Sequence, residues 1–204
     1  MKIQTKVQKE VIAEVAAECI NNRISLVLAA KRKVLIDDEG LGCAGYFDPE
    51  ERVLAVATKR PDWFLTLLHE FGHMQQWRED PSSFEGDEDE DFWDWLTGAA
   101  ELSKRKLRRS VNEIRRMELD CEKRVADCII RNPELGIDLT AYIKQANAYL
   151  YLYTVVAKHR KWVSLKKKAP YVVPEIVRLM PDTLSQNYWK PPRGYERLVI
   201  KHCF

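Results

Sequence analysis

The 204-residue sequence predicts an α+β fold, because its strand-like and helix-like segments lie in separate parts of the chain. Short apolar runs closed by turn residues gather between residues 33 and 57. Apolar residues at helical spacing dominate the sequence on both sides of this region. A hydrophobic content of 46% and a charged content of 31% are typical of a globular protein that buries its own core.

The first part of the chain is expected to hold a helix, a small antiparallel sheet and a second helix. Apolar residues recur at helical spacing over residues 5–30. A short apolar run at 33–37 predicts a strand, and residues 45–57 predict a hairpin with Asp-Pro-Glu-Glu at its turn. The next helix is predicted over residues 62–78, with Asp62 as its cap.

The second part is expected to be mostly helical. Residues 79–98 contain an acidic run and predict an inserted surface loop. Helices are predicted over residues 99–131 and 138–164, the first ended by Asn-Pro. The proline-punctuated tail, residues 165–204, is expected to wrap the surface around one short helix near 174–180.

These elements predict one domain over residues 1–164, on which the tail packs. The chain has no run of 18 apolar residues, and its N-terminus lacks the apolar core of a signal peptide. Five cysteines occur without a CxxC pair, which favours buried thiols over a disulfide framework. We therefore expect a cytoplasmic protein without a membrane partner. The sequence predicts no particular oligomeric state.

The net charge is only +2, but the charges are segregated along the chain. An acidic run spans residues 85–94, a basic run spans 104–109, and a second basic cluster spans 158–168. The plain interpretation is that these runs are solvated faces. Two alternatives are nucleic-acid contact by the basic faces and an acidic flap over a basic groove.

The pattern His-Glu-x-x-His at residues 69–73 points to a metal site. Residues four apart on a helix share a face, so His69 and His73 can present two imidazole nitrogens to one zinc ion. Glu70 lies beside the first histidine, where a carboxylate can take a proton from a metal-bound water. The alternative is a core helix with incidental histidines, which the spacing disfavours.

A catalytic zinc takes three protein ligands and keeps one position for water. The third ligand must therefore come from another segment. Glu118 and Glu122 are four apart on the predicted helix 99–131 and share a face. One of these carboxylates can bind zinc while the other hydrogen-bonds a ligand histidine and fixes its tautomer.

Together these segments resemble the gluzincin class of zinc metallopeptidases, in which a glutamate on a later helix is the third ligand. Within that class the chain is similar to ImmA/IrrE-type and CAAX-processing peptidases, and to uncharacterised phage-encoded proteins assigned as metallopeptidases. The residues that carry the later part of the resemblance are Glu118, Cys121, Glu122 and the pair Val125-Ala126, which comes one residue late. The resemblance covers residues 62–78 and 113–129.

The resemblance implies a zincin-like fold and a zinc ion held by His69, His73 and Glu118. Glu122 would then hydrogen-bond a ligand histidine, and exchanged roles for Glu118 and Glu122 are the next alternative. The implied activity is hydrolysis of peptide bonds in a protein or peptide substrate, by a zinc endopeptidase in the cytoplasm, or in the host cytoplasm for a phage-encoded protein. Glu70 would pass the proton of the attacking water to the leaving amine.

Asp120 and Glu113 are the remaining candidates for the third ligand. Taken without the histidine motif, all four carboxylates would be a solvated face paired with neighbouring arginines and lysines. Two histidines and one carboxylate also suit manganese or iron.

Other parts of the mechanism are predicted by residue type only. An oxyanion donor is needed, and the candidates are Tyr149, Tyr151, Tyr153 and His159. The strand at residues 53–57 is expected to pair with an extended peptide substrate. The alternative functions are a DNA-associated protease resembling the SprT-like group, suggested by the basic helices, and a non-catalytic binding or regulatory protein stabilised by its metal.

Overall fold

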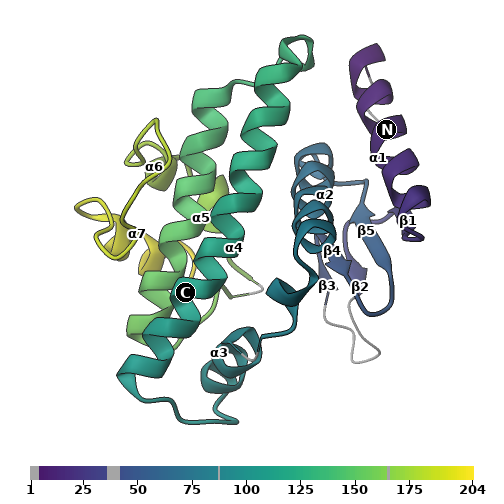
Figure 1. Cartoon of the computed structure of the whole chain (residues 1–204). Helices are drawn as coiled ribbons and strands as arrows, with labels where there is room; N and C mark the ends of the chain where they lie inside the picture. The colour runs from purple at the N-terminus through teal and green to yellow at the C-terminus, as the bar shows by residue number, and fades with distance from the viewer. Residues whose placement is uncertain (1–4, 36–41, 87, 165) are drawn as a thin grey trace. The chain divides into compact units, whose positions relative to one another are not determined.

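The computed structural model describes residues 5–35, 42–86, 88–164 and 166–204 (Figure 1). The described residues form seven α-helices and two small sheets, which is the expected α+β class. Their contacts divide the chain into two compact units. The first unit comprises residues 1–85 and 121–136, and the second comprises residues 86–120 and 137–204. This grouping does not test the predicted domain boundary after residue 164.

A mixed three-stranded sheet forms the centre of the first unit. Its order is β1 (Ser25–Ala29), β5 (Val53–Ala57) and β4 (Gly45–Asp48). The central strand β5 pairs antiparallel with β4 and parallel with β1. The shorter strands β2 (Val34–Leu35) and β3 (Gly42–Cys43) form a separate antiparallel pair.

The position of β5 corrects one prediction about substrate binding. Both hydrogen-bonding edges of β5 are already paired, so the expected pairing of residues 53–57 with a peptide is wrong. Among the described residues, β1 and β4 are the edge strands of this sheet.

The prediction of one helix over residues 5–30 was wrong at its C-terminal end. Helix α1 (Lys6–Asn21) ends before Arg23, whose φ of 58° lies in the left-handed region. The chain then enters β1, whose parallel pairing makes the sheet mixed and not antiparallel as expected. Apolar residues over 24–28 fit either period, so spacing alone could not separate strand from helix here.

The predicted hairpin at residues 45–57 is confirmed. Asp48 pairs with Val53 at the end of the β4–β5 ladder. The Oδ1 atom of Asp48 accepts hydrogen bonds from the backbone N–H groups of Glu50 and Glu51, both at 2.9 Å. This side chain therefore closes the turn in the way that aspartate favours.

Helix α2 (Trp63–Glu79) follows β5 and packs on β4 and β5. Leu54 and Val56 of β5 lie in one buried cluster with Leu67 and Met74 of α2 and Val15 of α1. The alternate residues of β5 pack on the opposite side, with Val34. The central strand β5 is thus covered on both faces, which explains why it is apolar without alternation.

The N-terminus of α2 differs from the prediction in one detail. Asp62 occupies the cap position, but its side chain makes no capping hydrogen bond. Its two carboxylate oxygens instead accept bonds of 2.9 and 2.7 Å from Arg60. A bidentate guanidinium competes well with a single backbone N–H.

The predicted loop at residues 79–98 contains helical structure. A 3₁₀ turn, η1 (Pro81–Phe84), is followed by helix α3 (Glu88–Thr97). Acidic residues in a first turn suit the positive end of the helix dipole. Phe92 and Trp95, three residues apart, are buried. Residues 88–94 of the acidic run thus belong to a helix and not to a loop.

Besides α3, the described part of the second unit contains two long helices and two short ones. Helix α4 (Lys104–Arg131) is continuous, and its first part belongs to this unit. Helix α5 (Leu139–His159) begins at Asp138, whose side chain accepts a bond from Ala141 N–H at 3.0 Å. Helices α6 (Pro174–Val177) and α7 (Tyr195–His202) complete it. Two further 3₁₀ turns are η2 (Pro133–Leu135) in the first unit and η3 (Pro170–Val172) in the second.

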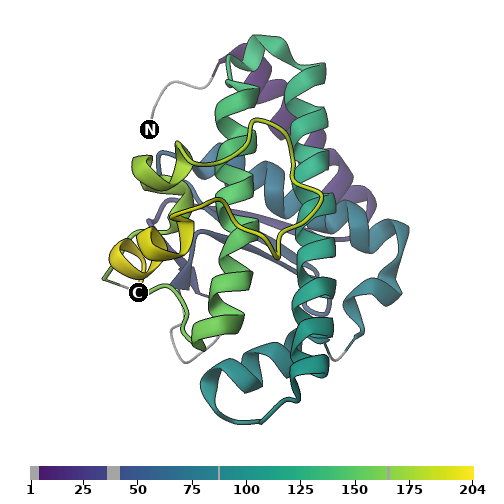
Figure 2. The same ribbon diagram turned by 90° about the vertical axis from the view of Figure 1, so that its left-hand side faces the viewer.

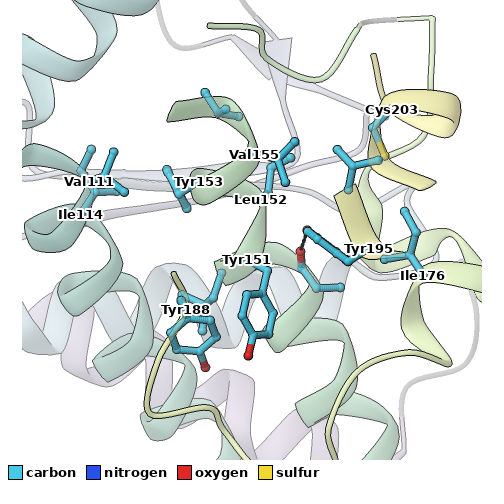
Figure 3. Packing of buried hydrophobic residues seen from close by; sticks show 14 of the residues in the cluster. Val111, Ile114, Tyr151, Leu152, Tyr153, Val155, Ile176, Tyr188, Tyr195 and Cys203 are labelled. Atoms are coloured by element: carbon cyan, nitrogen blue, oxygen red, sulfur yellow. Dashed lines mark hydrogen bonds between the residues drawn. The ribbon is translucent and has the colours of Figure 1, made fainter. Parts of the chain in front are cut away.

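The tail from residue 166 is part of the core of the second unit. The expected short helix is present as α6, but α7 was not predicted. Tyr188 and Tyr195 from the tail pack against Tyr151 of α5, and the hydroxyl of Tyr195 donates to the carbonyl of Ala148 (Figure 3). The tail runs across α5 in Figure 2. The proline-containing tail therefore contributes buried side chains to the core and does not only wrap the surface.

A buried amide ties the tail to α5. The side-chain nitrogen of Asn147 donates to the carbonyls of Pro181 at 3.0 Å and Thr183 at 2.9 Å. Its oxygen accepts from the hydroxyl of Tyr188 at 2.8 Å and from the backbone N–H of Ser185 at 3.2 Å. All four hydrogen-bonding positions of the amide are used.

None of the described helices combines the length and the apolar character needed to cross a bilayer. The cytoplasmic location and the zincin-like details of the fold stay predictions.

Replacing Asn147 by Ala should lower the free energy of unfolding by about 2–3 kcal/mol, because two carbonyls and two donors lose their partner in a buried place. Urea unfolding measures this change. The control is Asn187→Ala, which removes one exposed bond to the backbone N–H of Trp189 and should cost about 1 kcal/mol or less. Equal losses in the two variants would contradict the role of Asn147.

Candidate metal centre

The two motif histidines lie on one face of α2, as their spacing predicts. The Nε2 atoms of His69 and His73 are 3.1 Å apart, and the ring centroids are 4.7 Å apart. Two nitrogens bound at ~2.1 Å to one tetrahedral zinc are themselves about 3.4 Å apart. The Nε2 pair is therefore close to the separation that one shared ion requires.

The other ring nitrogens of the two histidines face polar groups. The Nδ1 atom of His73 lies 2.8 Å from Oε1 of Gln76, one turn later on α2. The Nδ1 atom of His69 lies 3.3 Å from Oε1 of Glu122 on α4. An Nδ1–H that donates to an oxygen leaves Nε2 unprotonated and able to bind a metal.

Cys121 is the third member of the cluster. One ligand atom each from His69, His73 and Cys121 lie within 4.8 Å of one another, so these residues could hold a metal ion. The Cys121 sulfur, however, donates to the carbonyl of His69 at 3.0 Å and lies 3.5 Å from its Nδ1. The thiol thus contacts His69 at its backbone carbonyl and at the Nδ1 side of its ring.

Cys121 was not among the predicted ligands. Its signals in the sequence are its place among the residues that carry the resemblance and its position next to Glu122. Which residue of α2 a thiol on another helix approaches depends on packing, so spacing could not reveal this contact.

The surroundings of His69 favour positive charge on its ring. Burial acts to lower the pKa of His69, but the Cys121 sulfur and the Glu122 carboxylate raise it, and the net pKa lies well above the ordinary value. A bound cation would satisfy the same electrostatic preference.

Glu70 is buried on α2 beside the sheet. A Cβ atom at Gly45 of β4 would lie 3.1 Å from Cγ of Glu70, 2.7 Å from Cγ2 of Thr66 and 2.9 Å from the carbonyl of Ala55. Only glycine lets β4 approach α2 this closely. Burial, and then the charge of Glu70, raise the pKa of Cys43 to about 11, which also places the Glu70 carboxylate near β3.

Glu118 is buried in the second unit, on the part of α4 that precedes Cys121. Its Oε1 atom accepts hydrogen bonds from the hydroxyls of Tyr149 and Tyr153, both at 3.2 Å. Burial, and then the charge of Glu118, raise the pKa of Tyr149 well above its ordinary value, so this phenol remains a donor. The assignment of Glu118 as the third ligand stays a prediction.

The other residues proposed by type lie elsewhere. The hydroxyl of Tyr151 donates to Ser185 at 2.8 Å, and His159 lies 2.7 Å from Glu196. Glu113 pairs with Arg116 at 2.9 Å on an exposed face. These three side chains have structural partners of their own. The role of Asp120 stays open.

No family model, curated protein or solved structure matches this chain. The resemblance to gluzincins therefore rests on the residues already described and stays a prediction. What the site can do follows from its own geometry.

Gly72, inside the motif, allows α2 to pack closely on Cys121. A Cβ at Gly72 would lie 2.8 Å from the Cys121 sulfur, which is buried. Gly72→Ala should therefore lower the free energy of unfolding by about 1–3 kcal/mol. Without the sulfur, the atoms nearest to this Cβ would be the carbonyl oxygen of Cys121 at 3.5 Å and its Cα at 3.7 Å. Both are ordinary van der Waals distances.

The test is a double-mutant cycle in urea with Gly72→Ala and Cys121→Ala. Alanine at position 72 should cost much less when Cys121→Ala is already present. Additive effects of the two substitutions would show that the sulfur is not what Gly72 accommodates.

Proposed function

We propose that this protein is a zinc-dependent metallopeptidase that hydrolyses peptide bonds of a protein or peptide substrate. The observation that supports it best is the 3.1 Å separation of the His69 and His73 Nε2 atoms, each ring with an oxygen partner at Nδ1. Metal-binding histidines almost always have such a partner at their other ring nitrogen.

A zinc ion at this place would lower the pKa of a coordinated water toward ~7 and polarise a carbonyl group. Glu70 follows the first ligand histidine and is buried beside β4. Its carboxylate would take the proton of the attacking water and deliver it to the leaving amine. Glu122 would hold the imidazole of His69 in the tautomer that leaves Nε2 open.

Glu118 is the proposed third ligand, on the strength of its place one turn before Glu122 on α4. Hydrogen bonds from Tyr149 and Tyr153 to its Oε1 favour the ionised carboxylate that a metal ligand must be. The reversed assignment, with Glu122 on the metal, remains the first alternative.

The substrate is proposed to bind in extended form along β4. This strand is an edge of the sheet among the described residues, and it contacts α2 near Glu70. An edge strand offers backbone N–H and C=O groups to an added peptide strand. The proposal thus places the peptide on the edge strand β4 and not on the central strand β5, which the sequence had suggested.

A second candidate is a non-catalytic, metal-stabilised protein. The observation that favours it is the Cys121 sulfur within reach of both histidines. A thiolate on the metal, together with a carboxylate, would close the fourth position and leave none for water. The hydrogen bond from this sulfur to the His69 carbonyl is the argument against it.

Glu70→Gln should reduce cleavage of fluorescently labelled casein by about 100-fold or more, because glutamine cannot accept the proton of water. Zinc content, measured by mass spectrometry, should stay at the wild-type level because Glu70 is not a ligand. Glu79→Gln is the matched control at the exposed end of α2. Cleavage of casein by Glu70→Gln at the wild-type rate would contradict the proposal.

Glu118→Gln and Glu122→Gln should separate the two carboxylates. Loss of a ligand should weaken zinc binding by more than the ~10–100-fold expected for loss of a hydrogen-bond partner. Competition with a coloured chelator measures both affinities, and we expect the larger loss for Glu118→Gln. The reverse order would exchange the two roles, and unchanged affinity in both variants would place the third ligand elsewhere.

A further inference from the structure

A basic face lies on the first part of α4, within the second unit. Residues 104–116 contain seven lysines and arginines and a single acidic residue, Glu113. Glu113 pairs with Arg116, and Asp91 of α3 pairs with Lys106. The carboxylates nearest this stretch are thus already engaged at its edges.

Two other arginines of this face meet one tryptophan. The guanidinium carbons of Arg108 and Arg115 lie 5.0 and 4.3 Å from the ring centroid of Trp189. Asn112 lies between them in sequence, and its Oδ1 accepts a bond of 2.8 Å from the Trp189 indole N–H. We call Arg108, Asn112, Arg115 and Trp189 the Trp189 patch.

Arg115 is buried without an anion. Its guanidinium donates to the Val111 carbonyl, the Thr154 hydroxyl and the Asn112 amide oxygen, which are all neutral. Among the described residues no carboxylate pairs with Arg115 or Arg108. Burial, and then the positive charge of Arg108, lower the pKa of Arg115 to about 10, so Arg115 stays charged at neutral pH.

Two neighbouring cations in this setting repel each other, and a buried arginine ordinarily has an anionic partner. A negative charge that the described residues do not supply would therefore stabilise this pair. The ring of Trp189 is partly exposed, and the next residue, Lys190, is exposed. An exposed guanidinium that lies over an aromatic ring can bind a backbone phosphate and offers a planar surface to a neighbouring base.

We propose that the Trp189 patch binds single-stranded nucleic acid. Arg108, which is exposed and lies over the Trp189 ring, receives a backbone phosphate, and an unpaired base stacks on this cation–aromatic pair. A duplex would offer phosphates but no accessible base face, and an acidic peptide would match the charge without using the indole. This inference goes beyond the proposed peptidase activity and does not depend on it.

The test is fluorescence anisotropy of the full-length protein with a labelled dT20 strand at several salt concentrations. Arg108→Ala and Trp189→Ala should each weaken binding on the order of 10-fold. Arg108→Ala should also reduce the slope of log affinity against log salt by about 1. Arg116→Ala, on the same helix but paired with Glu113, is the control and should change affinity by less than about 2-fold.

Arg108 is exposed, so its substitution should leave the fold intact. The test therefore remains informative even if Trp189→Ala lowers stability. Glu70→Gln should bind dT20 as the wild type does, which separates this result from the fate of the peptidase proposal. Absence of dT20 binding would overturn the inference, as would unchanged affinity in Arg108→Ala. Tighter binding of a 20-base-pair duplex, or equal competition by polyglutamate, would assign the patch to another partner and also overturn it.

Discussion

The close packing of Gly72 against Cys121 is the contact on which the proposed metal site depends. It holds the middle of α2 against the residues of α4 that belong to the same unit. Because Cys121 donates to the His69 carbonyl, the next residue, Glu122, is held within 3.3 Å of the His69 ring. Since a larger residue at position 72 would displace the sulfur, the orientation of His69 depends on this glycine.

The different roles of the polar groups around His69 and His73 follow from that packing. Each histidine has one nitrogen facing an oxygen of its own unit and the other facing its partner histidine. The sulfur lies 3.5 Å from the Nδ1 atom of His69 and donates to its backbone carbonyl. Charge, hydrogen bonding and distance therefore agree on where a cation would bind.

The sequence predicted those parts of the molecule that depend on local spacing. The helix that contains the motif, the hairpin at residues 45–57 and a helix that starts at residue 138 were all predicted, because each depends on neighbours close in sequence. The parallel pairing of β1 with β5 was missed, since it joins residues 28 apart through a crossover. Helix α3 was missed because its acidic first turn looks like a solvated loop when the burial of Phe92 is unknown. Tail residues such as Tyr195 are buried only through long-range contacts, which a proline-rich sequence does not reveal.

In the site, the pairing of His69 with His73 follows from α-helical geometry, whereas the approach of Cys121 depends on packing between helices.

The central claim is that two histidine nitrogens and oxygen atoms, without sulfur, bind zinc. X-ray absorption at the zinc edge of the purified protein tests it most directly, because zinc–nitrogen and zinc–sulfur distances differ, at ~2.0–2.1 Å and ~2.3 Å. The account predicts a first shell of nitrogen and oxygen only, with the outer-shell scattering of two imidazole rings. A sulfur atom at ~2.3 Å would contradict it, and would make Cys121 a ligand of a closed site.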